Sequence, residues 1–389
     1  MKRLLLPLLL PLLAATAFAQ GPLAPPNSSG PQVGPVAPLD GSGNPQPTMK
    51  TLHQVEPRTP VQTLAVSAPY TISQPGSYYL TGNITVASGD AIVIASDDVS
   101  LDLNGFTLKS TYTGGSSGTA VSVSSSRSRL TIRNGSIVGS TVVPASGSAT
   151  AGGFVQGIYS NGIITQALVS GIHVTGVAGD GIYLDVQGLI ERCTVTHCGG
   201  GGIFADEVRD CSVKKCYGTA ITALGNASNC TGSATGSGKQ GLLISGNATN
   251  CTGIAINGDG LSCIGNATNC SGISNSGFGL TCSGNAMNCS GNSTTGTGLS
   301  CTGNATNCTG TSASTGLFAV GNATNCIGIT TGNSDKGLWC GHTATSCYGQ
   351  SPGGGTSATA LKAAIAIGCT YTLGTSTGID VPLDKRFNM

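Results

Sequence analysis

The chain has 389 residues, of which 61 are glycine and only 8% are charged, and its formal net charge is +1. An ordinary globular domain carries about a quarter charged residues. Binding to nucleic acid or to an acidic membrane surface depends on an excess of lysine and arginine. The composition therefore argues against both classes of partner.

The N-terminus has the pattern of a secretory signal peptide over residues 1–19. Lys2 and Arg3 precede an apolar run, and small residues lie before a predicted cleavage site after Ala19. No later apolar segment is long enough to span a bilayer. We therefore expect a secreted protein, extracellular or at the cell surface, with the periplasm as an alternative.

Residues 20–62 hold ten of the 17 prolines. Such a composition is typical of an extended linker that forms no packed core. We predict a Pro-rich disordered linker here and a folded region over residues 63–389.

Residues 220–349 repeat the motif Gly-Leu-Ser-Cys-x-Gly-Asn-Ala-Thr-Asn-Cys-Thr-Gly. The closing cysteines stand at 251, 270, 289, 308, 326 and 347, so the steps are 19, 19, 19, 18 and 21 residues. A period near 19 indicates a solenoid, in which stacked coils share one core. The runs before this region are short and rich in β-branched residues, which predicts strands there too.

Three columns of apolar residues recur once per coil. If each unit is one coil of a parallel solenoid, members of a column stack about 4.8 Å apart and fill a narrow core. The first column is Ile158, Ile182, Ile203, Ile221, Leu242, Leu261, Leu280, Leu299, Leu317, Leu338, Leu361 and Ile379. The second is Ile172, Cys193, Cys211, Cys230, Cys251, Cys270, Cys289, Cys308, Cys326, Cys347 and Cys369. The third is Ala223, Ile244, Cys263, Cys282, Cys301, Ala319 and Cys340.

The variable period separates two kinds of solenoid. A strict period of 18, made of hexapeptides, would indicate a left-handed β-helix, and no hexapeptide repeats here. Parallel crossovers also prefer the right hand. We predict an all-β fold: a single-stranded right-handed parallel β-helix (β-solenoid) with coils of 18–24 residues and 14 to 16 coils in all.

The first predicted coils resemble a known family. Gly89-Asp90-Ala91-Ile92-Val93-Ile94 and the alternating run from Leu101 to Leu108 look like the entry coils of the right-handed parallel β-helix proteins of the pectate-lyase-like superfamily. The signal, the Pro-rich stem and the Asn-Ala-Thr-Asn-Cys array are similar to exported bacterial members. The resemblance covers residues 63–389 and implies the fold. The superfamily includes lyases, hydrolases, epimerases, tailspikes and adhesins.

The sixteen cysteines of an exported protein raise the question of disulfides. Successive cysteines of one column would point the same way, with Cβ atoms farther apart than a bridge requires. The columns also contain Ile and Ala, which cannot form bridges. We favour buried thiols, a cysteine ladder. The alternative is a set of bridges within coils, between Cys263 and Cys270, Cys282 and Cys289, Cys301 and Cys308, and Cys340 and Cys347.

Asparagines recur in the same coils, at 226, 247, 266, 285, 304 and 322, and all but Asn285 stand in Asn-x-Ser/Thr sequons. Glycosylation is one interpretation. The other is an asparagine ladder, in which side-chain amides hydrogen-bond along the stack. Glycans would collide at sites one strand apart, so we favour the ladder.

Candidate site residues lie earlier, because the only charged residues between Tyr217 and Leu361 are Lys239, Asp259, Asp335 and Lys336. The first apolar column predicts outward neighbours that stack in successive coils: Tyr159, Tyr183 and Phe204, followed by Asn161, Asp185 and Asp206. Asp180 is close in sequence. The alternative interpretation of this group is a stabilising aromatic ladder with solvated acids.

The stacked rings and carboxylates suggest a face for polysaccharide or a cell-surface glycan. Asp185 and Asp206 are candidate ligands for Ca²⁺, the one cofactor that the sequence suggests, and paired carboxylates can cleave glycosidic bonds. The catalytic motifs of polygalacturonases and pectate lyases are absent from the sequence. We therefore predict a non-enzymatic binding protein, with a polysaccharide lyase or glycoside hydrolase acting through Asp185 and Asp206 as the alternative.

Overall fold

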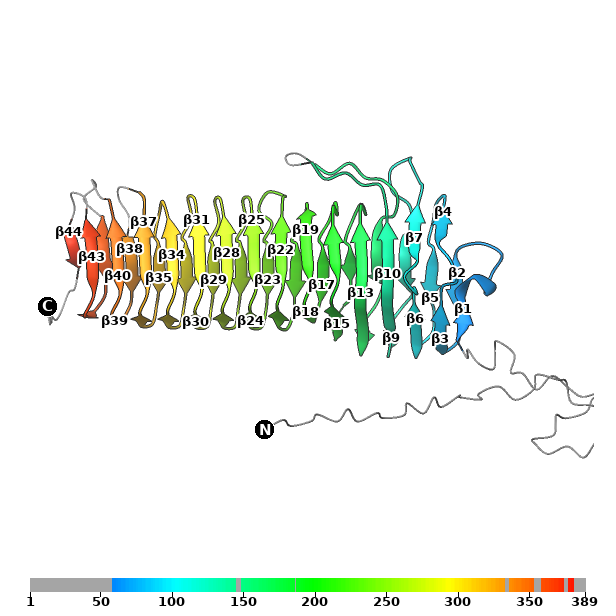
Figure 1. Cartoon of the computed structure of the whole chain (residues 1–389), viewed down its shortest axis with the longest axis horizontal. Helices are drawn as coiled ribbons and strands as arrows, with labels where there is room; N and C mark the ends of the chain where they lie inside the picture. Colours follow the sequence, from blue (N-terminus) through cyan, green and yellow to red (C-terminus); the bar gives the residue numbers. More distant parts are fainter. Residues whose placement is uncertain are drawn as a thin grey trace, which may run out of the picture. The chain divides into compact units, whose positions relative to one another are not determined.

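The structure, a computed structural model, describes residues 58–144, 148–185, 187–332, 336–352, 358–373 and 377–380. The signal peptide and nearly all of the predicted linker lie outside these residues. Residues 58–389 form one compact unit, a stack of parallel coils (Figure 1). The first strand, β1 (Thr59–Pro60), pairs with β3 (Gly76–Tyr79), and Val61 is fully buried, so the solenoid begins four residues before the predicted boundary at Thr63.

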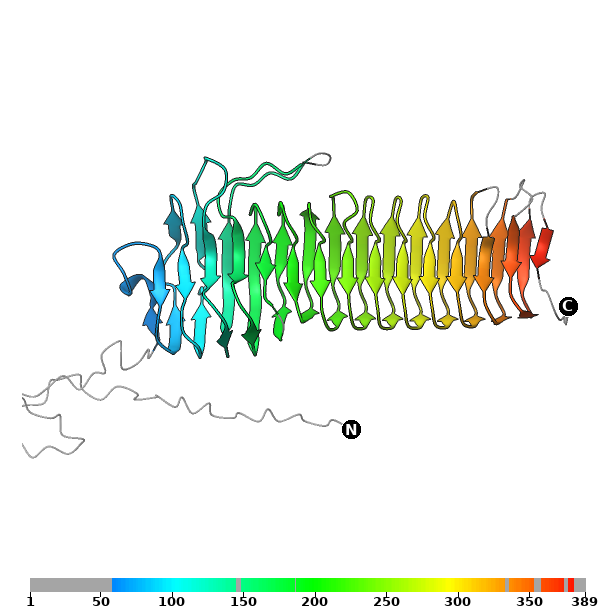
Figure 2. The ribbon, with the colours of Figure 1, turned by 180° about the vertical axis from the view of Figure 1, so that it is seen from behind.

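Each regular coil contributes one strand to each of three parallel ladders, which we call A, B and C (Figures 1 and 2). Ladder A is a 15-stranded sheet. Its strands are β2 (Tyr70–Ile72), β5 (Ile92–Ile94), β8 (Thr119–Val123), β11 (Gln156–Ser160), β14 (Ile182–Tyr183), β17 (Ile203–Ala205), β20 (Ile221–Ala223), β23 (Leu242–Ile244), β26 (Leu261–Cys263), β29 (Leu280–Cys282), β32 (Leu299–Cys301), β35 (Leu317–Ala319), β38 (Lys336–Cys340), β41 (Thr359–Lys362) and β44 (Thr377–Asp380).

Ladders B and C belong to one 27-stranded sheet, because the long strands β10 (Thr131–Val138) and β13 (Ala167–Thr175) run through both. Ladder B also contains β1, β3, β6 (Val99–Asp102), β15 (Gly188–Glu191), β18 (Glu207–Arg209), β21 (Ala227–Ser228), β24 (Ala248–Thr249), β27 (Ala267–Thr268), β30 (Ala286–Met287), β33 (Ala305–Thr306), β36 (Ala323–Thr324), β39 (Thr343–Thr345) and β42 (Ile365–Ile367).

Ladder C is the third wall. Its remaining strands are β4 (Ile84–Val86), β7 (Thr107–Ser110), β16 (Thr194–Thr196), β19 (Ser212–Cys216), β22 (Thr231–Ala234), β25 (Thr252–Ala255), β28 (Ser271–Ser274), β31 (Ser290–Ser293), β34 (Thr309–Ser312), β37 (Ile327–Thr330), β40 (Tyr348–Ser351) and β43 (Thr370–Leu373). A short pair, β9 (Arg127–Ser128) with β12 (Ile164–Thr165), and one 3-10 turn, η1 (Val61–Thr63), complete the described elements.

The predicted first column is confirmed along its whole length. Every member from Ile158 to Ile379 is the register partner of the next on ladder A. Leu261, Leu280 and Leu299 are fully buried. The coils that precede this column are longer: the register partners Ile92 and Val121 are 29 residues apart, and Val121 and Ile158 are 37 apart.

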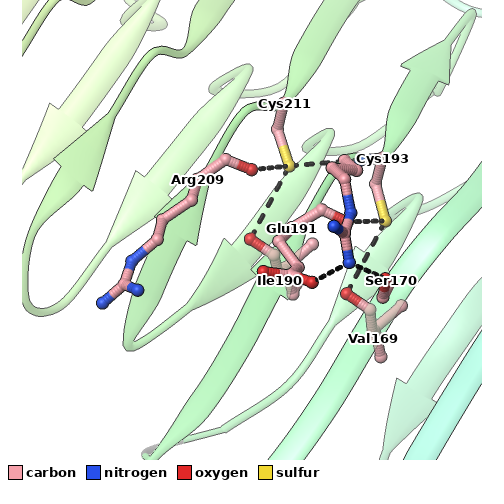
Figure 3. Close-up of polar contacts among 8 residues, drawn as sticks. Val169, Ser170, Ile190, Glu191, Cys193, Arg209 and Cys211 are labelled. Carbon is pink, nitrogen blue, oxygen red and sulfur yellow. Dashed lines mark hydrogen bonds and ion pairs between the residues drawn. The ribbon is translucent and has the colours of Figure 1, made fainter.

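The cysteines are free thiols, as predicted, and fifteen of the sixteen are buried. Figure 3 shows two members of the second column, Cys193 and Cys211. Each thiol donates to a carbonyl of its own coil, Cys193 to Glu191 at 3.2 Å and Cys211 to Arg209 at 3.1 Å. Each also reaches a carbonyl of the preceding coil, that of Val169 or Ile190. The column thus fills the core and hydrogen-bonds to carbonyl groups at the bend between ladders B and C.

The predicted asparagine ladder lies at the bend between ladders A and B. The Oδ1 atom of Asn247 accepts two bonds from the next coil, from the backbone N–H of Asn266 at 2.9 Å and from its Nδ2 at 3.1 Å. The same pair of bonds links all six members, from Asn226 to Asn322. Since Nδ2 is the atom that would carry a glycan, the structure favours the ladder over glycosylation.

A second asparagine ladder, which the sequence analysis missed, lies at the bend between ladders B and C. Its members Asn250, Asn269, Asn288 and Asn307 have φ values of 53°. Asparagine tolerates this left-handed backbone better than most residues. The Nδ2 of Asn269 donates to the Oδ1 of Asn250 at 3.1 Å, and the bond repeats in the following coils.

Candidate functional site

The outward side chains of ladder A form one continuous column, which we call the outward column. Each member follows a buried residue of ladder A, which belongs to the first apolar column from Tyr159 onward, and is half-buried itself. In order along the stack the members are Val93, Ser122, Tyr159, Tyr183, Phe204, Thr222, Leu243, Ser262, Thr281, Ser300, Phe318, Trp339 and Lys362.

The predicted stack of three rings is confirmed within this column. The ring centroids of Tyr159 and Tyr183 lie 5.3 Å apart with a tilt of 36° between the planes. Those of Tyr183 and Phe204 lie 4.6 Å apart and are nearly parallel, at 12°. Each inner ring face is therefore covered by a neighbouring ring, and only the ends of the stack can offer a face to a ligand.

The stack ends where Phe204 is followed by Thr222, its register partner on the next coil. A threonine is too small to cover the outer face of a phenyl ring. A depression of about 450 Å³ lies at this end, and its lining includes Tyr183, Phe204, Thr222, Tyr217 and Lys239. This volume is in the range of small-ligand sites.

The polar groups of the depression come from the turns that lead into ladder A. Asp180, Thr219 and Lys239 line it together with four glycines, at 199, 200, 201 and 218. These glycines have no side chains to fill the depression, so it stays open on their side. Asp180 and Lys239 provide one acid and one base, so the hollow has no excess of either charge.

Asp180 has the environment of a candidate acid, but its position indicates a structural role. Burial raises the pKa of its carboxyl group, and the N–H of Gly201, which donates to Oδ1 at 2.6 Å, lowers it in part. Asp90 and Asp259 occupy the same place, two residues before the buried residue of ladder A. They accept equivalent bonds from Thr119 and Phe278, at 2.7 and 2.9 Å. The carboxylate thus ties one coil to the next.

The other predicted site residues lie at the opposite end of the same strands. Asn161 is exposed and Asp185 and Asp206 are half-buried. Asp206 lines a separate hollow of about 250 Å³, together with Glu207 and Gln187. Asp185 acts on the ring beside it: burial raises the pKa of the Tyr183 hydroxyl, and the negative charge of Asp185 raises it further. The depression at Phe204 therefore does not include the two predicted carboxylates.

In the part of the chain that the structure describes, no three His, Cys, Asp or Glu side chains come together as a metal site. The suggestion that Asp185 and Asp206 hold Ca²⁺ stays a prediction. Within the same residues, no helix is both long and apolar enough to cross a membrane.

An arm inserted between β10 and β11 borders the depression. Its two sides pair through Val142 and Thr150, whose backbone hydrogen bonds measure 3.0 and 2.9 Å. Figures 1 and 2 show the arm leaving the solenoid near β10 and running along the edge of the following coils. A methyl group at Gly199 would lie 3.3 Å from Cβ of Ala149, so the arm reaches the rim of the hollow.

Comparison with known proteins bears on the fold. The family model described as right handed beta helix region matches residues 76–233. The chain is a right-handed parallel β-helix protein. Its fold is therefore the one that the entry coils predicted from their resemblance to the pectate-lyase-like superfamily, and the predicted hand is confirmed. No curated protein matches the sequence.

Two solved structures are similar to this β-helix at a low level. One is the full-length tailspike protein 2 from the Escherichia coli O157:H7 bacteriophage CAB120, with 10% identity, a TM-score of 0.22, and coverage of 78% of this chain and 34% of that one. The other is DFA-IIIase from Arthrobacter chlorophenolicus A6 in complex with GF2, with 12% identity, a TM-score of 0.25, and coverage of 84% and 80%. The chain thus spans about a third of the length of the tailspike.

The repeat pattern of the sequence did not predict the depression. Tyr217 and Lys239 stand in turns, whose lengths vary between coils, and no repeat places them beside Phe204. It did place Tyr183 and Phe204 correctly, because both belong to strands whose register the apolar column fixes.

Proposed function

We propose that this β-helix is an exported carbohydrate-binding protein that stacks a sugar ring on the outer face of Phe204. The observation that carries the proposal is the end of the aromatic stack at Thr222, inside the depression. A bound sugar would occupy the place that the next ring of the ladder would fill. Pyranose rings have an apolar face of C–H groups, which packs on an aromatic ring as another apolar plate would.

The groups around this place suit a sugar. Tyr217 and Thr219 offer hydroxyl groups, and Lys239 offers three N–H donors. Ligand sites commonly join an apolar wall to a few polar groups that fix orientation. A neutral or mildly charged sugar fits better than a strongly charged ligand, because Asp180 and Lys239 balance each other.

A binding role fits the carboxylates better than catalysis does. Asp180 lines the depression, and its counterparts Asp90 and Asp259 make the same backbone contact in other coils. The enzymatic alternative, a lyase or hydrolase, relies on Asp185 and Asp206, which line no part of the depression at Phe204. We therefore place recognition at Phe204 and assign no catalytic residue.

The location follows from the sequence pattern. The signal peptide over residues 1–19 would export the protein. The Pro-rich stem would act as a spacer between the N-terminal end of the mature chain and the solenoid. The sugar ligand would then be an extracellular polysaccharide or a cell-surface glycan, or a periplasmic glycan if the protein stays in that compartment.

The proposal is tested with a glycan array followed by calorimetry on each glycan that binds. We expect Phe204→Thr, which continues the threonine of the next coil, to weaken binding at least about tenfold. The melting temperature should fall by only a few degrees, because one ring contact with Tyr183 is lost. The matched control is Val93→Thr, four register steps from Phe204 on the same column and outside the depression, and this variant should bind normally. Equal binding by Phe204→Thr and the wild type would overturn the proposal.

The same glycans test the enzymatic alternative. Mass spectrometry after long incubation should show intact polysaccharide with the wild type. If products appear, and if they disappear in the Asp185→Asn/Asp206→Asn double variant, the alternative replaces the binding role.

A further inference from the structure

A second aromatic pair lies on the outward column near the C-terminal end of the solenoid. Phe318 and Trp339 are register partners on β35 and β38. Their ring centroids are 4.5 Å apart, and the planes meet at 62°, an edge-to-face contact. This geometry differs from the stack at Phe204, because an edge-to-face pair leaves part of a ring face without an aromatic neighbour.

Lysine side chains accompany this pair. The Nζ atom of Lys336 lies 4.6 Å from the centroid of the Trp339 ring. Lys362 is the register partner of Trp339 on the next coil. Between Tyr217 and Leu361 the sequence has only two lysines, and one of them is placed on the single tryptophan of the chain. The acid that precedes Lys336 in the sequence, Asp335, lies outside the described residues.

We propose that Phe318, Trp339 and Lys336 form a second sugar site, selective for a sugar that carries a carboxylate or a sulfate. This inference rests on the carbohydrate-binding function proposed above. A cation on a half-exposed ring is held weakly. Lys336 can therefore turn from the ring to the anionic group of the sugar, with which it forms a charge-assisted hydrogen bond. The ring face that Lys336 covers then becomes available to the sugar.

The two sites lie on one straight track. Six register steps separate Phe204 from Phe318, and the residues between them are Thr222, Leu243, Ser262, Thr281 and Ser300. At about 4.8 Å per step, the distance along the column is about 29 Å. Four of these five side chains carry a hydroxyl group, and none is charged.

A linear polysaccharide that places a neutral or mildly charged unit at Phe204 and an acidic unit at Lys336 would reach both sites along the solenoid axis. The hydroxyl groups between the two sites can form hydrogen bonds with sugar hydroxyls. Because these side chains are uncharged, they do not repel the anionic groups of the polysaccharide. Binding at one site then raises the local concentration of the polymer at the other. The partner class that this arrangement fits is a linear polymer with uronic acid or sulfated units.

The single tryptophan makes the second site visible without a label. We would titrate the full-length protein with three oligosaccharides of similar length: an alginate oligomer, which carries carboxylates; a dextran sulfate oligomer; and a neutral cello-oligosaccharide. We expect a saturable change in Trp339 emission with one or both acidic oligomers, and none with the neutral one. The response should weaken as salt is added, because exposed charge pairs are screened.

Two variants make the test specific. Lys336→Gln should weaken binding of the acidic oligomer by about tenfold and leave the melting temperature unchanged. Lys214→Gln removes the same charge from an exposed position on ladder C and should have no effect. A tryptophan signal that does not respond to either acidic oligomer, or that Lys336→Gln leaves unaltered, would overturn the second site.

Failure of this inference and failure of the proposed function give different results. If calorimetry shows binding that Phe204→Thr abolishes while Trp339 emission stays constant, the first site stands and the second does not exist. If Trp339 emission responds and Lys336→Gln weakens it while Phe204→Thr changes nothing, the second site stands alone. A polymer much longer than the track should bind the wild type more tightly than the short oligomer does, and either variant should remove that gain.

Discussion

The coils before Cys216 and the regular coils after Ala220 share one buried column but satisfy their outer groups in different ways. The earlier coils vary in length and use charged pairs, such as Arg129 with Asp98 and Arg133 with Asp102, at their bends. The regular coils repeat every 18 to 21 residues from Leu242 to Leu338 and use stacked asparagines instead. Because these coils are similar in length and sequence, equivalent asparagines of successive coils hydrogen-bond to one another. The depression lies mainly on the irregular coils, with its far edge at Lys239.

The largest effect that we predict concerns a glycine of the regular coils. A Cβ at Gly279, in the regular coils, would lie 2.3 Å from the backbone nitrogen of Asn292 and 2.5 Å from the carbonyl oxygen of Gly298. Backbone atoms of the same coil and of the next coil would have to move, so Gly279→Ala should cost about 3 kcal/mol of the free energy of unfolding. Urea unfolding followed by circular dichroism measures it.

The matched control is Gly82→Ala in the irregular coils, since a Cβ at Gly82 would have no atom within 4 Å. It should change stability by less than about 0.5 kcal/mol. Equal costs for the two substitutions would show that the close backbone atoms at Gly279 do not exclude a side chain there.

A smaller effect concerns the carboxylate that ties coils together at the depression. Asp180→Ala would leave the N–H of Gly201 without its partner and should cost about 1 kcal/mol. Asp180→Asn keeps an acceptor oxygen and should be at least as stable as the wild type at pH 7, because burial disfavours the charged carboxylate.

The pH dependence of Asp180 has a definite sign. Because its pKa is raised in the folded protein, the folded state binds the proton more tightly than the unfolded state does. The contribution of Asp180 to stability should therefore grow as pH falls through the folded pKa, and it is complete below the unfolded pKa of about 3.9. Unfolding of the wild type and Asp180→Asn at several pH values tests this. A wild type that loses stability relative to Asp180→Asn on acidification would contradict it.

The smallest effect is expected for reducing agents. All sixteen cysteines are free, and burial raises the pKa of the Cys340 thiol to about 11, so its reactive thiolate is rare at neutral pH. We expect dithiothreitol to leave the melting temperature unchanged. A thiol reagent should titrate sixteen groups in the unfolded, unreduced protein and few in the native protein. A count that is lower by pairs would show that disulfides within coils exist after all.

The sequence predicted the parts of the fold that repeat. Residues at the same position of each repeat must stack in a solenoid. The repeat alone therefore predicts the columns that contain Leu280 and Cys289, and the amide ladder that contains Asn266. The rings of Tyr183 and Phe204 were placed for the same reason. Their immediate ring contacts then followed from the strand spacing.

The sequence did not predict the parts of the molecule where turns of unequal length interrupt the repeat. The hollow beside Phe204 is formed by turns of unequal length that hold Tyr217 and Lys239, and no periodic pattern fixes such turns. The second asparagine of each repeat, such as Asn269, marks a corner with a left-handed backbone, but the amide ladder was predicted only for the first asparagine of each repeat. Phe318 and Trp339 also stand at the phase of Phe204, but five coils with small or aliphatic residues at that phase separate the two groups.

The most direct measurement of the central claim adds a ring instead of removing one. Thr222→Phe extends the aromatic ladder by one step and covers the outer face of Phe204, while every other group of the depression stays in place. Calorimetry with a glycan that binds the wild type should show binding weakened at least about tenfold in this variant, with the melting temperature unchanged or slightly raised. Undiminished binding would show that the sugar does not stack on Phe204 and would contradict the account.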